Sequence, residues 1–186
     1  MGLRDTLNNN SSLVTIVSVV VLVVALGIIV WTSKGPSGGG RTVNVYFYDL
    51  NTNKLFTTTN DQLAPIDAPS GPTAAGNKAG VMAYVYACGQ CGEYDGMTVE
   101  EVEATGAWIS RLEMYTPETI KAIEDAMKTS SNPDAAREEM GDTNSSLIKR
   151  PKDSGWTPMD SPKGMAIMRE QGTRTCPEGR PKFCLP

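Results

Sequence analysis

The sequence predicts an α+β domain carried on a membrane anchor. Three observations lead to this fold class: an apolar run near the N-terminus, a hairpin and an apolar strand followed by helix start signals, and four cysteines in two distant pairs. We therefore expect an N-terminal transmembrane helix, a flexible tether and a small domain. In that domain a β-hairpin and a central strand pack on two or three helices, and the cysteines staple the chain together.

The apolar run spans Leu13–Trp31, and its only polar members are Thr15 and Ser18. As a helix these 19 residues extend roughly 28 Å, which matches the hydrocarbon thickness of a bilayer. A cleaved signal peptide is the alternative, but its cleavage pattern at Val23 and Ala25 lies inside the run. The run therefore predicts a retained anchor that contacts membrane lipid through residues 13–31.

Charges around the run do not fix its orientation, because Arg4 lies on one side and Lys34 and Arg41 lie on the other. A short N-terminal tail before a first apolar run usually stays in the cytoplasm, which places the remainder of the chain outside. We therefore predict a single-pass protein with a periplasmic C-terminal domain. Its parts are a cytoplasmic tail (1–12), a transmembrane helix (13–32), a Gly/Ser/Pro tether (33–41) and an extracytoplasmic α+β domain (42–186).

The domain begins with a predicted β-hairpin over residues 42–58. Side chains alternate along VNVYFYD, with the valines and Phe47 on one face and both tyrosines on the other. The turn places Asn53 where a three-residue loop needs a left-handed backbone. A proline- and glycine-rich loop over residues 63–79 follows, and the apolar run Gly80–Ala87 then predicts the central strand.

Helix signals follow the strand. Thr98 and a glutamate three residues later form a capping box, and Val102, Ile109 and Leu112 recur on one helical face. We predict a helix over residues 98–114 that buries this face against the central strand.

Thr116 and Pro117 begin a second predicted helix, because a threonine N-cap followed by proline is a strong start signal. Ile120, Ile123 and Met127 form its apolar stripe, and we expect Ile123 to be buried with the face described above. The remaining predicted elements are a short turn (132–141), a polar linker (145–155) and a last short helix that begins at Ser161–Pro162 and stops at Gly172.

The four cysteines are the constellation that carries chemistry. Cys88 and Cys91 form a CxxC motif directly after the central strand, and Cys176 and Cys184 enclose a proline-rich loop at the C-terminus. We expect the two pairs to meet in space, because the tail after Gly172 has no periodicity that would let it fold alone. Its prolines are expected to keep it out of helix and sheet.

Three chemistries are open for these cysteines. An even number in an extracytoplasmic domain indicates disulfides. Four thiolates also suit tetrahedral zinc, so the expected cofactor is either none or one structural zinc bound by all four. A redox site at Cys88 and Cys91 is the third, although the helix start at Thr98 comes too late to lower the pKa of Cys88.

Composition excludes several classes of protein. The chain contains no His, which removes Ser-His-Asp and Cys-His catalysis and HExxH metalloprotease chemistry. Its net charge of −4 gives no support for nucleic-acid binding. The other noticeable groups have structural explanations: a solvated helix face for Glu100, Glu101 and Glu103, loop charge for the basic run Lys149–Lys152, and core or tail-docking aromatics for Trp108 and Trp156.

Ordered fragments of the chain are also familiar: YFYDLNTNKLF, GVMAYVYACGQCG, EMYTPE and the terminal CPEGRPKFCLP. Together they resemble a family of small, uncharacterised single-pass membrane proteins of planctomycete-type bacteria, over about Val43 to Pro186. The resemblance implies a membrane-anchored domain with paired cysteines, and it carries no catalytic residue over to this chain.

The sequence therefore predicts a non-catalytic, membrane-anchored envelope protein. Its domain is expected to serve as an interaction module or accessory subunit, with an envelope or membrane protein as its partner and no nucleic acid. The alternative is a thiol-disulfide oxidoreductase or metal carrier that works through Cys88 and Cys91.

Overall fold

The computed structural model describes Val21 and residues 42–130, 146–170, 174–177 and 179–186. The chain divides into two compact units, 1–39 and 40–186, and the strands and helices named below all belong to the second. Apart from Val21, the predicted cytoplasmic tail, transmembrane helix and tether lie outside the described residues. Within the described residues, no helix has the length and apolar character needed to cross a bilayer.

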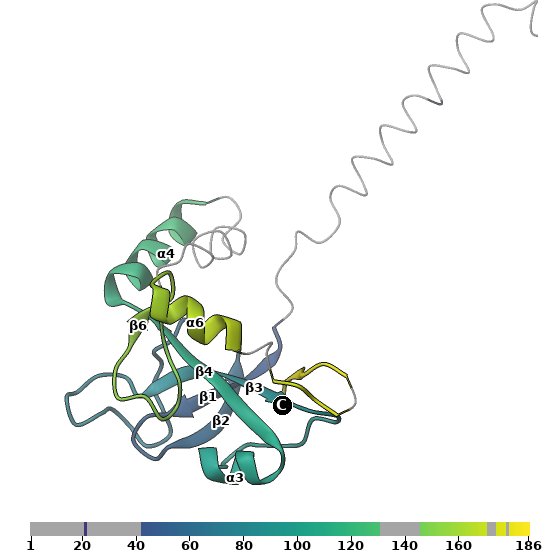
Figure 1. Ribbon diagram of the computed structural model, residues 1–186. Helices are drawn as coiled ribbons and strands as arrows, with labels where there is room; N and C mark the ends of the chain where they lie inside the picture. Colours follow the sequence, from purple (N-terminus) through teal and green to yellow (C-terminus); the bar gives the residue numbers. More distant parts are fainter. Residues whose placement is uncertain (1–20, 22–41, 131–145, 171–173, 178) are drawn as a thin grey trace, which may run out of the picture. The chain divides into compact units, whose positions relative to one another are not determined.

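The described residues of the domain form one antiparallel sheet of seven strands (Figure 1). Six strands follow the order β2-β1-β3-β4-β5-β6, and β7 pairs with β3 outside this path. The small α+β domain with an antiparallel sheet and two disulfides confirms the predicted class. The strands are β1 (Asn44–Asp49), β2 (Lys54–Thr59), β3 (Gly80–Ala87), β4 (Ala107–Tyr115), β5 (Ser146–Lys149), β6 (Thr157–Pro158) and β7 (Lys182–Cys184).

The predicted hairpin is confirmed as β1 and β2, which pair from Asn44↔Thr59 to Asp49↔Lys54. Asn53 has a backbone φ of 58°, so it occupies the left-handed position that the turn requires. The two faces of β1 enter different cores. The tyrosine face joins the main core, and the face of Val45 and Phe47 forms a smaller cluster with Ala64 and Ile66 of the following loop.

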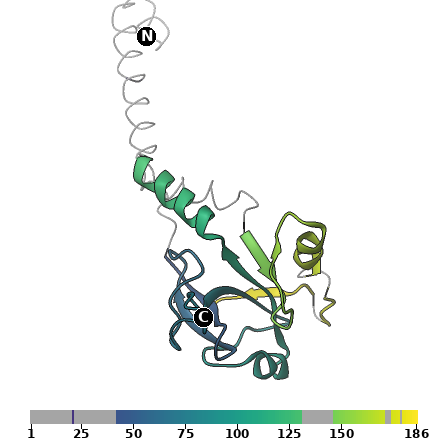
Figure 2. The ribbon, with the colours of Figure 1, turned by 90° about the vertical axis from the view of Figure 1, so that its left-hand side faces the viewer.

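The central strand is confirmed as β3. One edge is shared by two partners, because β1 pairs with Gly80–Met82 and β7 pairs with Val85–Ala87, while β4 follows the other edge. Gly80 is needed for close packing, since an added Cβ would lie 2.8 Å from Ile66 Cγ1 and 2.9 Å from a Phe56 ring carbon. Figure 2 shows β7 in yellow crossing the domain to reach β3.

The predicted helix over residues 98–114 is wrong beyond Ala104. It starts as expected: in α3 (Val99–Ala104) the Glu101 N–H donates to Thr98 Oγ1 at 3.3 Å, and the Thr98 N–H donates to Glu101 Oε2 at 2.7 Å. The chain then turns at Gly106, whose φ is 86°, and enters β4. A left-handed glycine directly after a helix is a stop signal, so the helix cannot continue.

The burial expected for this segment is nevertheless confirmed. Ile109 is 6% exposed and Leu112 is 0% exposed, and both pack in the main core with Val81 and Val85 of β3. Residues three apart normally face opposite sides of a strand. Here a register shift opposite Tyr84 and Val85 inserts an extra residue into β4, which returns both side chains to the same face.

The helix after β4 is confirmed as α4 (Pro117–Thr129), with Thr116 as its N-cap. Its side chain accepts from the Thr119 N–H at 3.3 Å. Ile123 is fully buried, but it does not belong to the core cluster that Val102, Ile109 and Leu112 form with β3, while the other two members of the predicted stripe are half-buried. The predicted short turn at 132–141 lies outside the described residues.

The predicted polar linker over residues 145–155 is wrong in its first part. Ser146–Lys149 forms β5, which pairs with the second half of β4, and its Ile148 is fully buried. The polar composition of this segment did not indicate a strand. One buried apolar side chain is enough to hold a four-residue strand in place when it pairs with a strand on each side, as β5 does. β6 then pairs with β5.

The last predicted helix is confirmed as α6 (Pro162–Glu170), which begins after Ser161. Ile167 is buried, and Gly164 lies so close to the Pro158 and Met159 backbone that no Cβ would fit. Its predicted stop, Gly172, lies outside the described residues. In Figure 1 α6 lies above β4 and α3 lies below it, and both helices contact that strand.

Candidate functional site

The two cysteine pairs meet at the end of β3, as expected from the sequence. Cys88 is joined to Cys176 and Cys91 is joined to Cys184, with S–S distances of 1.94 and 2.07 Å. The corresponding Cα atoms lie 5.3 and 5.5 Å apart. The tail is thus bonded covalently at two points to the loop that follows the central strand, which confirms that the four cysteines serve as disulfides in this structure.

This connectivity bears on the two other chemistries. A redox CxxC motif pairs its own two sulfurs, whereas Cys88 and Cys91 are each bonded to the tail. Zinc binding needs free thiolates, so it concerns only the reduced chain. Among the described residues, no group of three or more potential ligand side chains could hold a metal ion.

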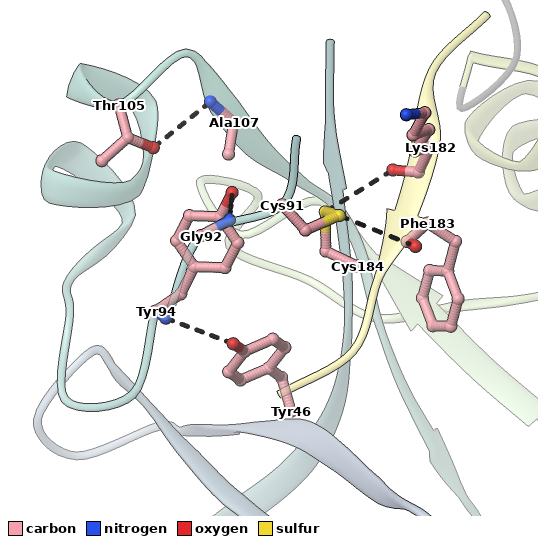
Figure 3. Close-up of a disulfide and its surroundings, with 9 residues drawn as sticks. All are labelled: Tyr46, Cys91, Gly92, Tyr94, Thr105, Ala107, Lys182, Phe183 and Cys184. Atoms are coloured by element: carbon pink, nitrogen blue, oxygen red, sulfur yellow. Dashed lines mark hydrogen bonds between the residues drawn. A yellow bond between two sulfur atoms is a disulfide. The ribbon is translucent and has the colours of Figure 1, made fainter. Parts of the chain in front are cut away.

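The loop that carries Cys88 and Cys91 is fastened to β1 by two tyrosines (Figure 3). The Gly92 N–H donates to the Tyr94 hydroxyl at 2.9 Å, and the Tyr94 N–H donates to the Tyr46 hydroxyl at 3.2 Å. The two rings lie 5.8 Å apart, and burial raises the pKa of Tyr46. Tyr94 therefore fixes the geometry of the disulfide loop, and no pattern in the sequence indicated this role.

The tail enters the sheet, so the expectation that its prolines keep it out is wrong. Lys182–Cys184 forms β7 and pairs with Val85–Ala87. Pro181 and Pro186 flank the strand and leave its three N–H groups intact, which is how proline is tolerated beside a short edge strand. Cys184 is part of the main core, and the residue is 1% exposed.

A row of aromatic rings lies on the face of the sheet opposite the main core. Phe183 of β7 packs against Tyr84 and Tyr86 of β3 at ring-centroid distances of 5.9 and 5.5 Å, and Tyr86 stacks on Trp108 at 6.2 Å. Arg174 places its guanidinium carbon 4.6 Å from the Trp108 ring centre. Trp108 therefore both packs in the sheet and contacts the tail, as the sequence predicted.

The same face holds a buried ion pair. Arg111 Nε lies 3.3 Å from Glu113 Oε2, and the two side chains are 8% and 10% exposed. The Arg111 guanidinium carbon also lies 3.5 Å from the centre of the Tyr84 ring. Burial raises the pKa of Tyr84, and the Glu113 carboxylate raises it further. The sequence did not reveal this pair, because the predicted helix placed these residues on different faces.

A hollow of about 220 Å³ lies beside the first half of β4, and we call it the β4 groove. It is open to solvent and combines apolar strand residues with charged side chains from three other segments. Its residues are Val99 and Glu103 of α3, Trp108–Ser110 of β4, the loop Arg150–Lys152, Glu170 at the end of α6, and Arg174.

Two ion pairs border the β4 groove. Lys152 Nζ lies 2.8 Å from Glu103 Oε2, and Arg150 forms a bidentate pair with Glu170. Hydrogen bonds from the Arg150 guanidinium lower the pKa of Glu170 and keep its carboxyl group ionised. Glu170 is therefore an ion-pair partner and not a proton donor. The basic run assigned to loop charge therefore has specific partners on α3 and α6.

Searches against protein-family models, curated proteins and solved structures find no match for this chain. The function proposed below therefore rests on the geometry of its own residues.

Proposed function

We propose that this chain is a non-catalytic envelope protein, anchored by residues 13–32, whose domain (42–186) is an extracytoplasmic interaction module or accessory subunit. The observation that carries the proposal is the pair of disulfides between the CxxC motif and the tail. Such bonds form and persist outside the reducing cytoplasm. A disulfide-bonded domain that follows an apolar run and a Gly/Ser/Pro segment is suited to display beyond a membrane surface.

The disulfides support a structural role more than a redox role. Each closes a long loop, with sequence separations of 88 and 93 residues, and loops of this length are the ones in which crosslinking most restricts the unfolded chain. Cys184 is also part of the main core. Reducing the Cys91–Cys184 bond would therefore disturb the packing of the core. A redox centre must be oxidised and reduced repeatedly, so a bond in this position is unsuited to that role.

The arrangement of charged groups also supports an interaction module. Glu103 and Glu170, the two carboxylates of the β4 groove, are each bound to a cation instead of facing one another as an acid–base pair. Arg111 and Glu113 are buried in the sheet behind Tyr84. Glu103 and Glu170 thus hold segments of the domain together, and Glu113 pairs with Arg111 within β4.

Membrane attachment and orientation are tested together. In alkaline carbonate, the full-length protein should remain with the membrane pellet. Of two single substitutions, Asn10→Cys and Lys78→Cys, only the second should react with a membrane-impermeant maleimide in intact cells, because Lys78 lies in an exposed loop of the domain. A soluble chain, or labelling of Asn10→Cys alone, would overturn the proposal.

The interaction role is tested by recovery of partners from a neutral-detergent extract. We expect a defined membrane or envelope protein to co-purify with the wild-type chain after mild crosslinking. Intact mass should be about 4 Da lower before reduction than after it, because each disulfide lacks two hydrogens. A monomeric chain that recovers no partner under these conditions would count against the accessory-subunit role.

A second candidate is thiol-disulfide exchange or metal carriage through the CxxC motif. One observation favours it: Cys88 and Cys91 are exposed, whereas their partners Cys176 and Cys184 are buried. An external thiol could therefore attack from the side of the motif. Replacing Cys88 and Cys91 with serine separates the two functions, because an enzyme would lose disulfide-reductase activity while it stayed folded, and a structural module would lose stability.

A further inference from the structure

The first half of β4 has an open edge. β5 pairs only with Leu112–Tyr115, and no strand in the described part of the chain pairs with Ala107–Arg111 on that side. The β4 groove runs along this open stretch. An unpaired strand edge is a natural place for an extended segment to dock, because it offers main-chain donors and acceptors. The bulge within β4 limits the contact to a short segment.

The charges around the groove favour an acidic occupant. Among the residues that line the groove, Arg150, Lys152 and Arg174 outnumber Glu103 and Glu170 by one, and Asp153, outside the lining, also pairs with Arg150 at 3.4 Å. Arg174 is therefore the cation that favours an acidic occupant. Arg174 is exposed and stacked over Trp108, and the described residues place no carboxylate within ion-pair distance of it. Its planar guanidinium is therefore free to bind a carboxylate in two-point fashion.

The ion pairs that border the groove can exchange partners. The side chains of Lys152 and Glu103 are 60% and 41% exposed, and those of Arg150 and Glu170 are 37% and 51% exposed. Solvent-exposed pairs contribute little to stability because water screens them, although a bidentate pair such as Arg150–Glu170 is stronger than a single contact such as Lys152–Glu103. An incoming carboxylate can thus replace Glu103 at Lys152 at little cost.

The charge of the whole domain favours a peptide over a lipid surface as the occupant of the groove. Residues 146–186 contain eight Lys or Arg and four Asp or Glu, whereas residues 42–145 contain six and sixteen. The basic region is thus embedded in an acidic domain, which an anionic membrane surface would repel. A concave groove with a strand edge fits a narrow chain better than a flat bilayer.

We propose that the β4 groove binds a short, extended, acidic segment of a partner protein, with one carboxylate held by Arg174. The inference rests on the proposed function as an interaction module, and it adds the chemistry of the partner and the place where it binds. Trp108 supports the Arg174 side chain, while Lys152 is available to a second carboxylate.

The test uses the full-length protein in a neutral detergent and three fluorescent heptapeptides that alternate valine with glutamate, glutamine or lysine. Fluorescence anisotropy should show binding of the glutamate peptide and at least about tenfold weaker binding of the other two. Arg174→Gln should lower the affinity for the glutamate peptide by about tenfold, and Arg174→Lys should lower it less because the charge is retained. Lys78→Gln is the matched control outside the groove and should have no effect.

Each contrary outcome is informative. Equal binding of the glutamine peptide would overturn the acidic specificity, and unchanged affinity of Arg174→Gln would overturn the assignment to this groove. Binding to phosphatidylglycerol vesicles but not to the glutamate peptide would show a lipid surface as the occupant. If Arg174→Gln still recovers the partner from cells, this inference fails alone; if wild type recovers none, the proposed function fails.

Discussion

The β1–β2 hairpin and the C-terminal tail are neighbours on the same edge of β3, yet they are held there in opposite ways. The hairpin pairs residues that are close in sequence around a turn fixed by Asn53. The tail pairs Cys184 with Val85 and depends on disulfides that span 88 and 93 residues. Local pairing costs little loop-closure entropy, whereas distant pairing costs more and is secured here by covalent bonds.

The largest expected effect breaks both regions at once. Leu112 is fully buried in a core that contains Tyr46 and Tyr48 of the hairpin and Cys184 of the tail. Leu112→Asp places an unpaired charge there and should destabilise the domain by more than about 4 kcal/mol. Thermal unfolding followed by circular dichroism measures the change, and Glu100→Asp on the exposed face of α3 is the control. Unchanged melting would show that this face is not the core.

Removing one disulfide should loosen the tail and spare the hairpin. The double substitution Cys91→Ser and Cys184→Ser should lower the free energy of unfolding by about 2–4 kcal/mol. Hydrogen exchange should become faster at the β7 amides and remain slow at Tyr46 and Tyr48 of β1. Equal acceleration in both strands would show that the two regions unfold together and that the comparison is mistaken.

Low pH should destabilise the hairpin region through protonation of Asp49. Burial alone would raise the pKa of its carboxyl, but hydrogen bonds from Ser70, Asn51 and Thr52 outweigh burial and lower it. A lowered pKa means that the carboxylate stabilises the fold above its unfolded pKa of about 3.9, and that this contribution is lost as the pH falls below that value. Asp49→Asn should therefore flatten the decline in stability below about pH 4. An unaltered acid profile would contradict this role.

The smallest effect concerns the hairpin turn alone. Asn53 has positive φ, and its Oδ1 accepts a hydrogen bond from the Tyr48 hydroxyl at 3.0 Å. Asn53→Ala should cost about 1 kcal/mol, because alanine is strained in the left-handed region. Asn53→Gly should cost less, since glycine has no Cβ. Denaturant midpoints of the two variants measure the difference. Because both variants lack the hydrogen bond to Tyr48, a loss for glycine equal to or greater than that for alanine would contradict backbone strain as the cause.

The same contrast explains which parts of the fold could be predicted from the sequence. The hairpin, the central strand and the start of α3 depend on residues a few positions apart, so alternation, turn chemistry and a capping box were sufficient. The meeting of the two cysteine pairs followed from the tail's need for a partner. Which cysteine joins which was not predictable, because only the folded sheet determines the distances between them.

The prediction of a helix where the chain forms β4 was wrong for a definite physical reason. Ile109 and Leu112 lie three residues apart, which is helical spacing, and the bulge opposite Tyr84 allows the same spacing to bury both from a strand. The decisive signal was Thr105–Gly106, which ends α3 with a left-handed glycine. The β4 groove could not be foreseen once this segment was taken as a helix, because the groove depends on an open strand edge.

The crossed disulfides also determine how the domain responds to a pulling force. Tension applied between Thr42 and the C-terminus reaches Cys91 through the strands and then passes directly to Cys184, so the chain between them bears none of it. If that bond is cut, the Cys88–Cys176 bond takes over once the chain from Cys176 to Cys184 straightens, at about 3.5 Å per residue. The domain therefore has a second, covalent limit on its extension, and α3, β4, α4 and α6 stay shielded from the force in either case.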